Sequence, residues 1–251
     1  MTTSQDITSP TACMICIGDE ILSGSVKDCN IQFLAKNLTA CGVHLAEVRI
    51  IEDGSDAIVS TLNSLRCKYD HIFTSGGIGP THDDVTVAAI SLCCGKPLVL
   101  NKKIKDLMEK PKKAKPDEYA LKMAFLPEGS EIISSKDYLF CGFQIANIYS
   151  FAGVPKIFQA AVKETLKTLK SHKPILSKSI CFTVSEQEIA KTLASLQEIN
   201  PDIKIGSYPF VKPGSHGTEV VLRGKNKESI DSVAKFLHTK ISIIEKTDGK
   251  Y

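Results

Sequence analysis

The chain has 251 residues, of which 43% are hydrophobic and 24% are charged. This composition indicates a globular protein with one large domain, or a large domain and a small one. No apolar run reaches the roughly 20 residues of a membrane-spanning helix, and no secretory signal is recognisable, so we expect a cytoplasmic protein without a membrane segment. The formal net charge is only +3, and three of the 31 basic residues are Arg, which argues against nucleic-acid binding.

Strand and helix signals alternate through the first two-thirds of the chain, after a tail at residues 1–10 that we expect to be flexible. Predicted strands cover residues 12–17, 43–51, 70–74, 131–133 and 146–151. Apolar side chains at helical spacing follow the first three strands, and Pro155 opens a helix to about residue 170. This alternation predicts a mostly parallel sheet with helices on both faces, a three-layer α/β/α sandwich.

The composition changes between residues 101 and 115, where seven Lys stand against two acidic residues and Pro111 interrupts any long helix. One interpretation is a solvated surface excursion. The other is a mobile cationic flap that closes over a phosphorylated ligand.

Beyond a linker near residue 172, the pattern changes to that of a small α+β unit. The predicted elements are a strand at 179–184, a helix at 186–199, strands at 203–208 and 219–223, and a helix at 227–244. We therefore expect two domains, at residues 11–172 and 178–251, and a βαββα order in the second. Residues 209–217 are predicted to be a long hairpin connection or a loop over the cleft.

The nine cysteines are odd in number and scattered, which is typical of reduced thiols. Cys13 and Cys16 have the spacing of a metal or redox motif, but they lie inside a predicted strand, where residues three apart point to opposite faces. No second CxxC or His pair is present to complete four ligands. We therefore expect the two thiols to pack in the core.

Two acidic, glycine-marked turns each follow a predicted parallel strand: residues 18–24 follow the first strand and residues 76–84 follow the third. In open α/β sheets, ligands bind beyond the carboxyl ends of the strands. Glycines let backbone N–H groups approach an anion, and a helix start near Thr81 would add its positive dipole end. The N–H groups of Gly76 to Gly79 are therefore predicted to bind a phosphate.

Four carboxylates are expected at the same sheet edge: Asp19, Glu20, Asp83 and Asp84. Oxygen ligands suit Mg²⁺, which can polarise a phosphoryl group and activate water. Asp83 and Asp84 also have a structural interpretation, because acids in the first turn of a helix stabilise its dipole by about 0.3–1 kcal/mol. Neither turn is a Walker loop, and no GxGxxG follows the first strand, which disfavours a P-loop kinase or a hydride-transfer enzyme.

Several segments together resemble the molybdopterin-binding (MoaB/Mog-like) domain, in the form found in competence/damage-inducible protein A and at the amino terminus of FAD synthases. They are GDEILSG (18–24), DCN (28–30), TSGGIGPTHDD (74–84) and GVP (153–155). The segment IGSYP (205–209) is similar to the small domain that follows in FAD synthases. The resemblance spans nearly the whole chain and implies the MoaB/Mog-like fold.

The resemblance also implies a site. Asp19, Asp83 and Asp84 are expected to be catalytic and to bind a divalent metal such as Mg²⁺, Mn²⁺ or Co²⁺. Together with the two turns, it predicts a ligand pocket formed by Gly18, Glu20, Ser23, Asn30, Ser75, Gly76, Gly77, Gly79, Pro80, Thr81, His82, Gly153 and Pro155. His82 is expected either to act as a general acid or to orient the loop. Ala120 and Met123 depart from the pattern, since relatives commonly have Asn and Gln in this segment.

Domains of this family bind or adenylylate molybdopterin, or hydrolyse the pyrophosphate of ADP-ribose or FAD. The resemblance therefore implies a metal-dependent pyrophosphatase with a small-molecule phosphate ligand. The alternative is a non-catalytic molybdopterin-binding protein, or a molybdopterin adenylyltransferase-like protein, of molybdenum cofactor biosynthesis. We expect a homo-oligomer. Because the chain ends at Tyr251, neither an amidohydrolase nor an adenylylating domain is expected, and FAD synthesis is not expected either.

Overall fold

The computed structural model describes residues 9–109, 118–169, 173–213 and 215–248. The chain divides into two compact units, one up to residue 172 and one from residue 173. Residues 1–8 of the predicted tail lie outside the described residues. No helix in the described ranges is long and apolar enough to cross a membrane.

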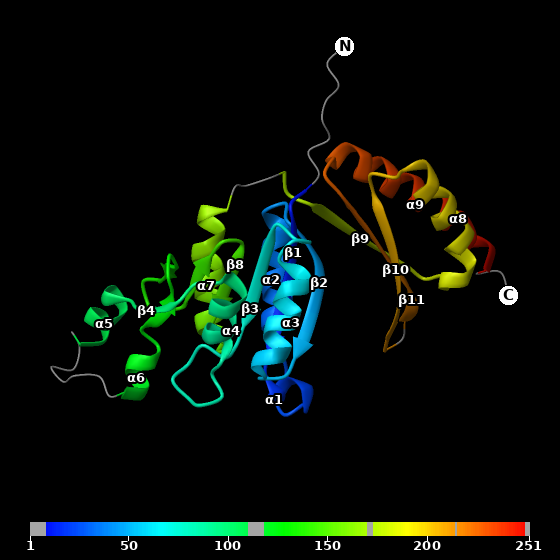
Figure 1. Cartoon of the computed structure of the whole chain (residues 1–251). Coiled ribbons are helices and arrows are strands. Elements are labelled where there is room, and N and C mark those ends of the chain that lie inside the picture. Colours follow the sequence, from blue (N-terminus) through cyan, green and yellow to red (C-terminus); the bar gives the residue numbers. More distant parts are fainter. Residues whose placement is uncertain (1–8, 110–117, 170–172, 214, 249–251) are drawn as a thin grey trace, which may run out of the picture. The chain divides into compact units, whose positions relative to one another are not determined.

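The larger unit contains the alternating elements that the sequence predicts, together with several short ones (Figure 1). In chain order they are β1 (Thr11–Ile17), α1 (Asp19–Leu22), α2 (Asn30–Ala40), β2 (His44–Ile51), α3 (Ser55–Leu65), β3 (His71–Ser75), α4 (Thr86–Cys94), β4 (Leu98–Leu100), α5 (Lys102–Glu109), α6 (Glu118–Lys122), β5 (Phe125–Pro127), β6 (Glu131–Ile133), β7 (Gly142–Ile145), β8 (Ile148–Phe151) and α7 (Pro155–Thr168).

The central sheet has the strand order β2-β1-β3-β8-β7-β6. β2, β1, β3 and β8 are parallel, and β7 and β6 add an antiparallel edge. The strand predicted at 146–151 is too long, because Ala146 and Asn147 form the turn of the β7–β8 hairpin. The Asn147 side chain holds this turn by donating to the backbone oxygens of Arg66 (3.0 Å) and Tyr69 (2.9 Å).

Helices cover both faces of this sheet, which confirms the three-layer sandwich (Figure 1). Cys13 and Ile15 of β1 pack against α3 and α4 on one face. Met14 and Cys16 pack against α2 and α7 on the other. Burial, as the largest cause, raises the pKa of both Cys13 and Cys16 to about 12. The two thiols are therefore core residues on opposite faces of the sheet, as predicted.

The Lys-rich segment is helical where the structure describes it. α5 is anchored to the core by Ile104, which is 1% exposed, and by Met108. Residues 110–117 lie outside the described residues, so closure of a flap stays a prediction.

The smaller unit has the predicted βαββα order. Its elements are β9 (Leu176–Phe182), α8 (Glu186–Ile199), β10 (Lys204–Lys212), β11 (Ser215–Gly224) and α9 (Lys227–Asp248), with the antiparallel strand order β10-β11-β9. The long loop predicted at 209–217 is wrong, because β10 and β11 stay paired as far as Lys212 and Ser215. Pro209 is tolerated in β10 because this is an edge strand, where a missing N–H donor breaks no second ladder.

An ion-pair network lies on β2 of the larger unit, around Glu47. Its carboxylate accepts from Arg49 Nε (2.7 Å), Lys68 Nζ (2.8 Å) and the Tyr69 hydroxyl (2.6 Å). These hydrogen bonds, with that of Lys68 the largest, lower the pKa of Glu47 to about 2.

This network predicts a pH dependence of stability. The pKa of Glu47 is lower in the folded chain than its ordinary value of 4.5, so the ionised carboxylate stabilises the fold above about pH 4.5. That contribution is lost as the pH falls towards 2. We expect Glu47→Gln to lower the urea midpoint of unfolding at pH 7. Between pH 4.5 and 2, the midpoint of this variant should fall less steeply than that of wild type. The control is Glu128→Gln, at an exposed position, which should leave the dependence of the midpoint on pH unchanged. Superimposable curves for wild type and Glu47→Gln would contradict this assignment.

Candidate functional site

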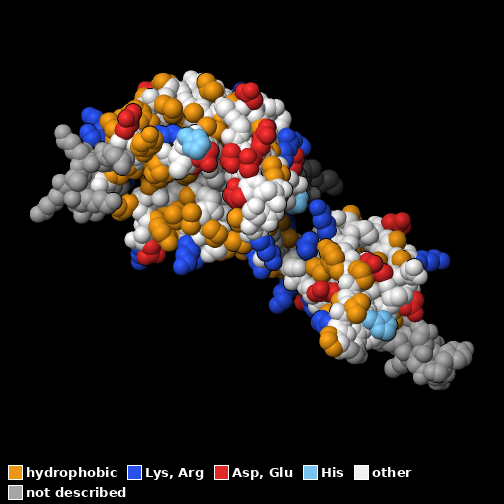
Figure 2. Space-filling model, turned by 90° about the horizontal axis from the view of Figure 1, so that it is seen from below, with side chains coloured by type: hydrophobic (Ala, Val, Ile, Leu, Met, Phe, Trp, Pro, Cys, Tyr) orange, Lys and Arg blue, Asp and Glu red, His pale blue; other side chains and the backbone are white. Residues whose placement is uncertain are grey.

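A pocket of about 430 Å³ lies beyond the carboxyl ends of the four parallel strands of the larger unit. Its lining comes from the segments that follow β1, β2, β3 and β8, and from Met123 and Phe140. Figure 2 looks onto the side on which α1 and the loop after β3 lie, and acidic side chains gather there beside apolar ones. The pocket is therefore at the sheet edge where the sequence predicts a site.

The glycine loop after β3 can exist only with glycine at two positions. Gly76 has φ +109°, and a Cβ there would overlap the carbonyl oxygen of Ile17. Gly77 has φ +68°, and a Cβ there would overlap the Thr86 hydroxyl. Because glycine has no side chain, the loop can lie directly against β1 and the start of α4.

The loop offers backbone donors to a ligand, but not from every residue predicted. The Gly76 N–H donates to the Phe151 oxygen (3.0 Å), so it is occupied by the sheet. The N–H groups of Gly77, Ile78 and Gly79 have no acceptor among the described residues. Three consecutive N–H groups beside a pocket are suited to binding a phosphate or another anion.

The helix predicted to begin near Thr81 begins five residues later, at Thr86. Asp84 Oδ2 accepts from the N–H of Thr81 (2.8 Å) and from its hydroxyl, which closes a turn over residues 81–84. The Thr86 N–H then donates to the Gly77 oxygen (3.0 Å) and joins the loop to the helix. Asp83 and Asp84 therefore do not lie in the first helical turn, and their interpretation as helix-dipole residues is wrong.

Four carboxylates line one end of the pocket: those of Glu20, Asp53, Asp83 and Asp84. The segments after β1 and β2 are joined by reciprocal bonds, from Asp19 N–H to Asp53 Oδ2 (3.1 Å) and from Asp53 N–H to Asp19 Oδ1 (3.4 Å). Burial raises the pKa of Asp53, and the negative charges of Glu20, Asp19 and Asp83 raise it further. A cation at this end of the pocket would relieve that repulsion.

Asp53 was missed by the sequence reasoning, although a signal was present. Glu52-Asp53-Gly54 is a third acidic, glycine-marked turn at the end of a parallel strand, equivalent in position to the turns after β1 and β3. Its signal is weaker than that of the other two turns, because the turn is short and carries only one glycine.

The predicted ligand residues fall into two groups. Those that line the pocket are Glu20, Gly76, Gly77, Gly79, Asp83, Asp84 and Gly153. Those that do not are Gly18, Asp19, Ser23, Asn30, Ser75, Pro80, Thr81, His82 and Pro155. The His82 side chain is 97% exposed, so in this conformation it neither orients the loop by packing nor reaches the pocket.

Asn30 supports the pocket from beneath. Its Nδ2 donates to Ser75 Oγ (3.0 Å) and to the Gly153 oxygen (2.8 Å), which links the end of β3 to the turn after β8. Asn30 Oδ1 and Thr86 Oγ1 are buried and have no hydrogen-bond partner among the described residues. Through the bonds of Asn30 Nδ2 and of the Thr86 N–H, both residues hold the glycine loop in place.

The predicted metal ligands do not form a ready-made cage. Within the described ranges, no three or more His, Cys, Asp or Glu side chains are grouped so as to hold a metal ion. Asp19 is bonded to the backbone of Asp53, and Asp84 to Thr81. Mg²⁺, however, is usually held by one or two carboxylates together with waters and substrate phosphates. The carboxylates lining the pocket fit a cation that arrives with a phosphate ligand.

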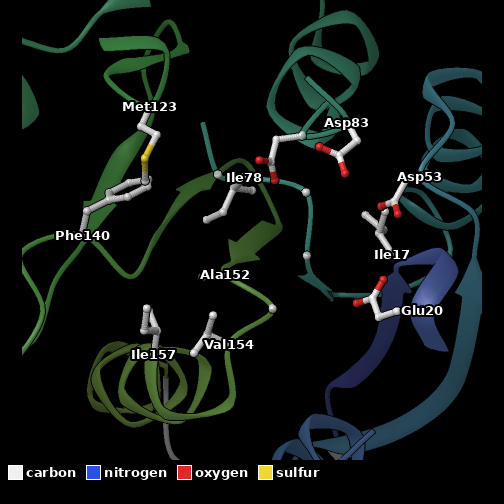
Figure 3. A pocket seen from close by; sticks show the side chains of 15 residues that line it. Ile17, Glu20, Asp53, Ile78, Asp83, Met123, Phe140, Ala152, Val154 and Ile157 are labelled. Atoms are coloured by element: carbon white, nitrogen blue, oxygen red, sulfur yellow. The ribbon is translucent and has the colours of Figure 1, made fainter. Parts of the chain in front are cut away.

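The other end of the pocket is apolar. Figure 3 shows Met123 beside Phe140 and, across a gap from them, Val154 beside Ile157. Glu20, Asp53 and Asp83 lie on the far side of Ile78. The pocket thus combines an acidic end, an apolar end and a glycine loop between them.

Comparison with known families assigns both units. Residues 13–172 match the family described as "Probable molybdopterin binding domain", and residues 174–247 match the one described as "FAD synthase, middle domain". The boundary between the matches coincides with the division between the compact units.

Similar proteins come from archaea, bacteria and animals. A protein of Archaeoglobus fulgidus is 29% identical over 225 residues, which cover 88% of this chain and 94% of that protein. A "Probable FAD synthase" of Caenorhabditis elegans is 26% identical over 90% of this chain, and a "CinA-like protein" of Shewanella woodyi is 32% identical over 88%. The chain spans about half the length of these last two, 49% and 54%.

A solved structure supports the fold of the larger unit. The crystal structure of the protein CinA from Thermoplasma acidophilum superimposes with a TM-score of 0.59 at 27% identity. The match covers 64% of this chain and 98% of that one.

Proposed function

Because the chain belongs to the family described as "Probable molybdopterin binding domain", we propose that it is a metal-dependent pyrophosphatase that cleaves ADP-ribose or FAD. The observation that carries the proposal is the pocket itself. Three residues with unoccupied N–H groups and four carboxylates line it, and none of the described residues that line it is cationic. A pyrophosphate needs a counterion there, because the carboxylates would otherwise repel it.

Each part of the pocket has a role in this proposal. The N–H groups of Gly77 to Gly79 bind one phosphate, and Glu20 and Asp83 hold the divalent cation. Bound there, the cation supplies charge neutralisation on the phosphoryl oxygens. Asp53 Oδ2 accepts the N–H of Asp19, which leaves Oδ1 to take a proton from the attacking water. The water oxygen bonds to phosphorus as the bridging P–O bond breaks, giving AMP and ribose 5-phosphate or FMN.

Product analysis tests the proposal. The full chain is incubated with ADP-ribose or FAD and with Mg²⁺, Mn²⁺ or Co²⁺, and the products are separated by chromatography. We expect AMP in equal amount to ribose 5-phosphate or FMN, and no product with a chelator. Absence of AMP in every combination would exclude the pyrophosphatase.

The description of the matched family favours a second candidate, a protein that binds molybdopterin without turnover. The glycine loop would then hold the phosphate of the pterin. Calorimetry with molybdopterin separates the candidates, since a chain that releases AMP and gives no heat with the pterin is not a pterin carrier.

A further inference from the structure

The apolar end of the pocket takes no part in the proposed hydrolysis. It consists of Met123, Phe140, Ala152, Val154 and Ile157, which we call the apolar wall. These residues come from four places: the turn after α6, the segment between β6 and β7, the turn between β8 and α7, and the first turn of α7. Figure 3 shows Met123 beside Phe140, with Ile157 and Val154 on the neighbouring helix and turn.

The apolar wall is available to a ligand. Val154 is 55% exposed, and Met123 and Phe140 are only partly buried. A flexible thioether beside an aromatic ring is an adaptable surface for flat apolar groups. No side chain of the wall carries a strong hydrogen-bond donor or acceptor, so it can stabilise a ligand only through burial of apolar surface.

The two substrates considered above differ in how well they fit such a wall. ADP-ribose and FAD share an ADP half and the bond that is cleaved. Beyond that bond, ADP-ribose carries a sugar whose hydroxyls would lose their hydrogen bonds to water against the wall. FAD carries a three-ring system whose benzenoid edge has two methyl groups and no polar atom. Burial of that edge is favourable.

We propose, resting on the pyrophosphatase function above, that the apolar wall recognises the flavin ring and that Met123 and Phe140 are specificity-determining residues. The acidic end and the glycine loop bind the pyrophosphate common to both ligands. The apolar wall then makes the protein bind FAD more tightly than ADP-ribose.

Binding measurements test this inference independently of turnover. Dissociation constants for FAD and for ADP-ribose are measured by calorimetry with Mg²⁺ in full chains that carry Asp53→Asn, which slows cleavage of the ligand during the titration. One such chain has no further change and serves as wild type for the apolar wall, and three carry a second substitution. Met123→Gln puts a polar amide of similar length on the wall, and Met123→Leu keeps the position apolar. Leu139→Gln is the matched control, because Leu139 is next to Phe140 in the chain, 52% exposed and not part of the lining.

We expect wild type to bind FAD at least about 10-fold more tightly than ADP-ribose, the scale on which apolar pockets discriminate. Met123→Gln is expected to reduce this ratio about 10-fold, whereas Met123→Leu and Leu139→Gln keep it. Equal affinities in wild type, as would follow if adenine occupied the wall, would overturn the inference. So would a ratio that Met123→Gln leaves unchanged.

The AMP assay keeps the two proposals apart. AMP release without a preference for FAD would overturn the flavin wall alone. A preference for FAD that depends on Met123, without AMP release, would overturn the pyrophosphatase alone.

Discussion

Gly76→Ala is expected to reduce AMP release more than about 100-fold and to lower the free energy of unfolding by about 1–3 kcal/mol. Residue 76 has a φ of +109°, and the new Cβ would overlap the carbonyl oxygen of Ile17. The loop therefore has to move away from β1. A displacement of this kind takes the N–H groups of Gly77 to Gly79 out of position. Single-turnover AMP release and urea unfolding measure the two effects.

Gly95→Ala is the matched control for this variant. Gly95 also has a positive φ, +62°, but a Cβ there meets nothing within 4 Å. We expect it to cost about 1 kcal/mol from the backbone conformation alone and to leave AMP release unchanged. If Gly76→Ala behaved in the same way, the loop would not be the phosphate-binding element.

Asp53→Asn is expected to lower the turnover number by about 10²–10⁴-fold, the range for loss of a general base. The free energy of unfolding of this variant is not expected to fall. The amide oxygen can still accept the N–H of Asp19, which now bonds to Asp53 Oδ2 at 3.1 Å. In addition, burial and neighbouring negative charge raise the pKa of Asp53 in the folded chain, so its ionised carboxylate is less favourable there than in the unfolded chain, and an uncharged amide avoids this cost.

Glu52→Gln provides the control for Asp53→Asn, because Glu52 is the adjacent carboxylate, is exposed and does not line the pocket. We expect its turnover number and unfolding midpoint to match those of wild type. An Asp53→Asn variant with wild-type turnover would remove Asp53 from the mechanism. One that lost stability and turnover together would make its role structural.

Local patterns were sufficient for much of the fold. Parallel strands covered on both faces appear as short apolar runs, and the helices between them show their buried stripe at helical spacing. Helix α8 was predicted with its observed bounds, Glu186–Ile199, and in the structure Ser185 and Glu188 form a capping box at its start. The glycine loop at 76–79 was recognisable in the sequence because its glycines are neighbours in the chain and directly follow a predicted strand.

Other features depended on contacts that local patterns do not contain. The strands β4, β5 and β7 have only three or four residues each, too few for a period to show. The start of α4 at Thr86 is held by the hydrogen bond from its N–H to the Gly77 oxygen, which joins the helix to the glycine loop. The extended hairpin of β10 and β11 depends on pairing between strands, which outweighs the turn propensity of Pro209.

By itself, the sequence determined the layer architecture, the division of the chain into an α/β unit and a βαββα unit, and the sheet edge at which a ligand would bind. Only the tertiary structure decided which side chains meet there. Asp53 shares a pocket with the glycine loop because the order β2-β1-β3-β8 brings the ends of separate strands together. Met123 and Phe140 reach the same pocket from the turn after α6 and from the segment before β7. A strand's own residues specify its faces through their alternation, whereas its neighbours in a sheet are chosen by packing of the whole domain.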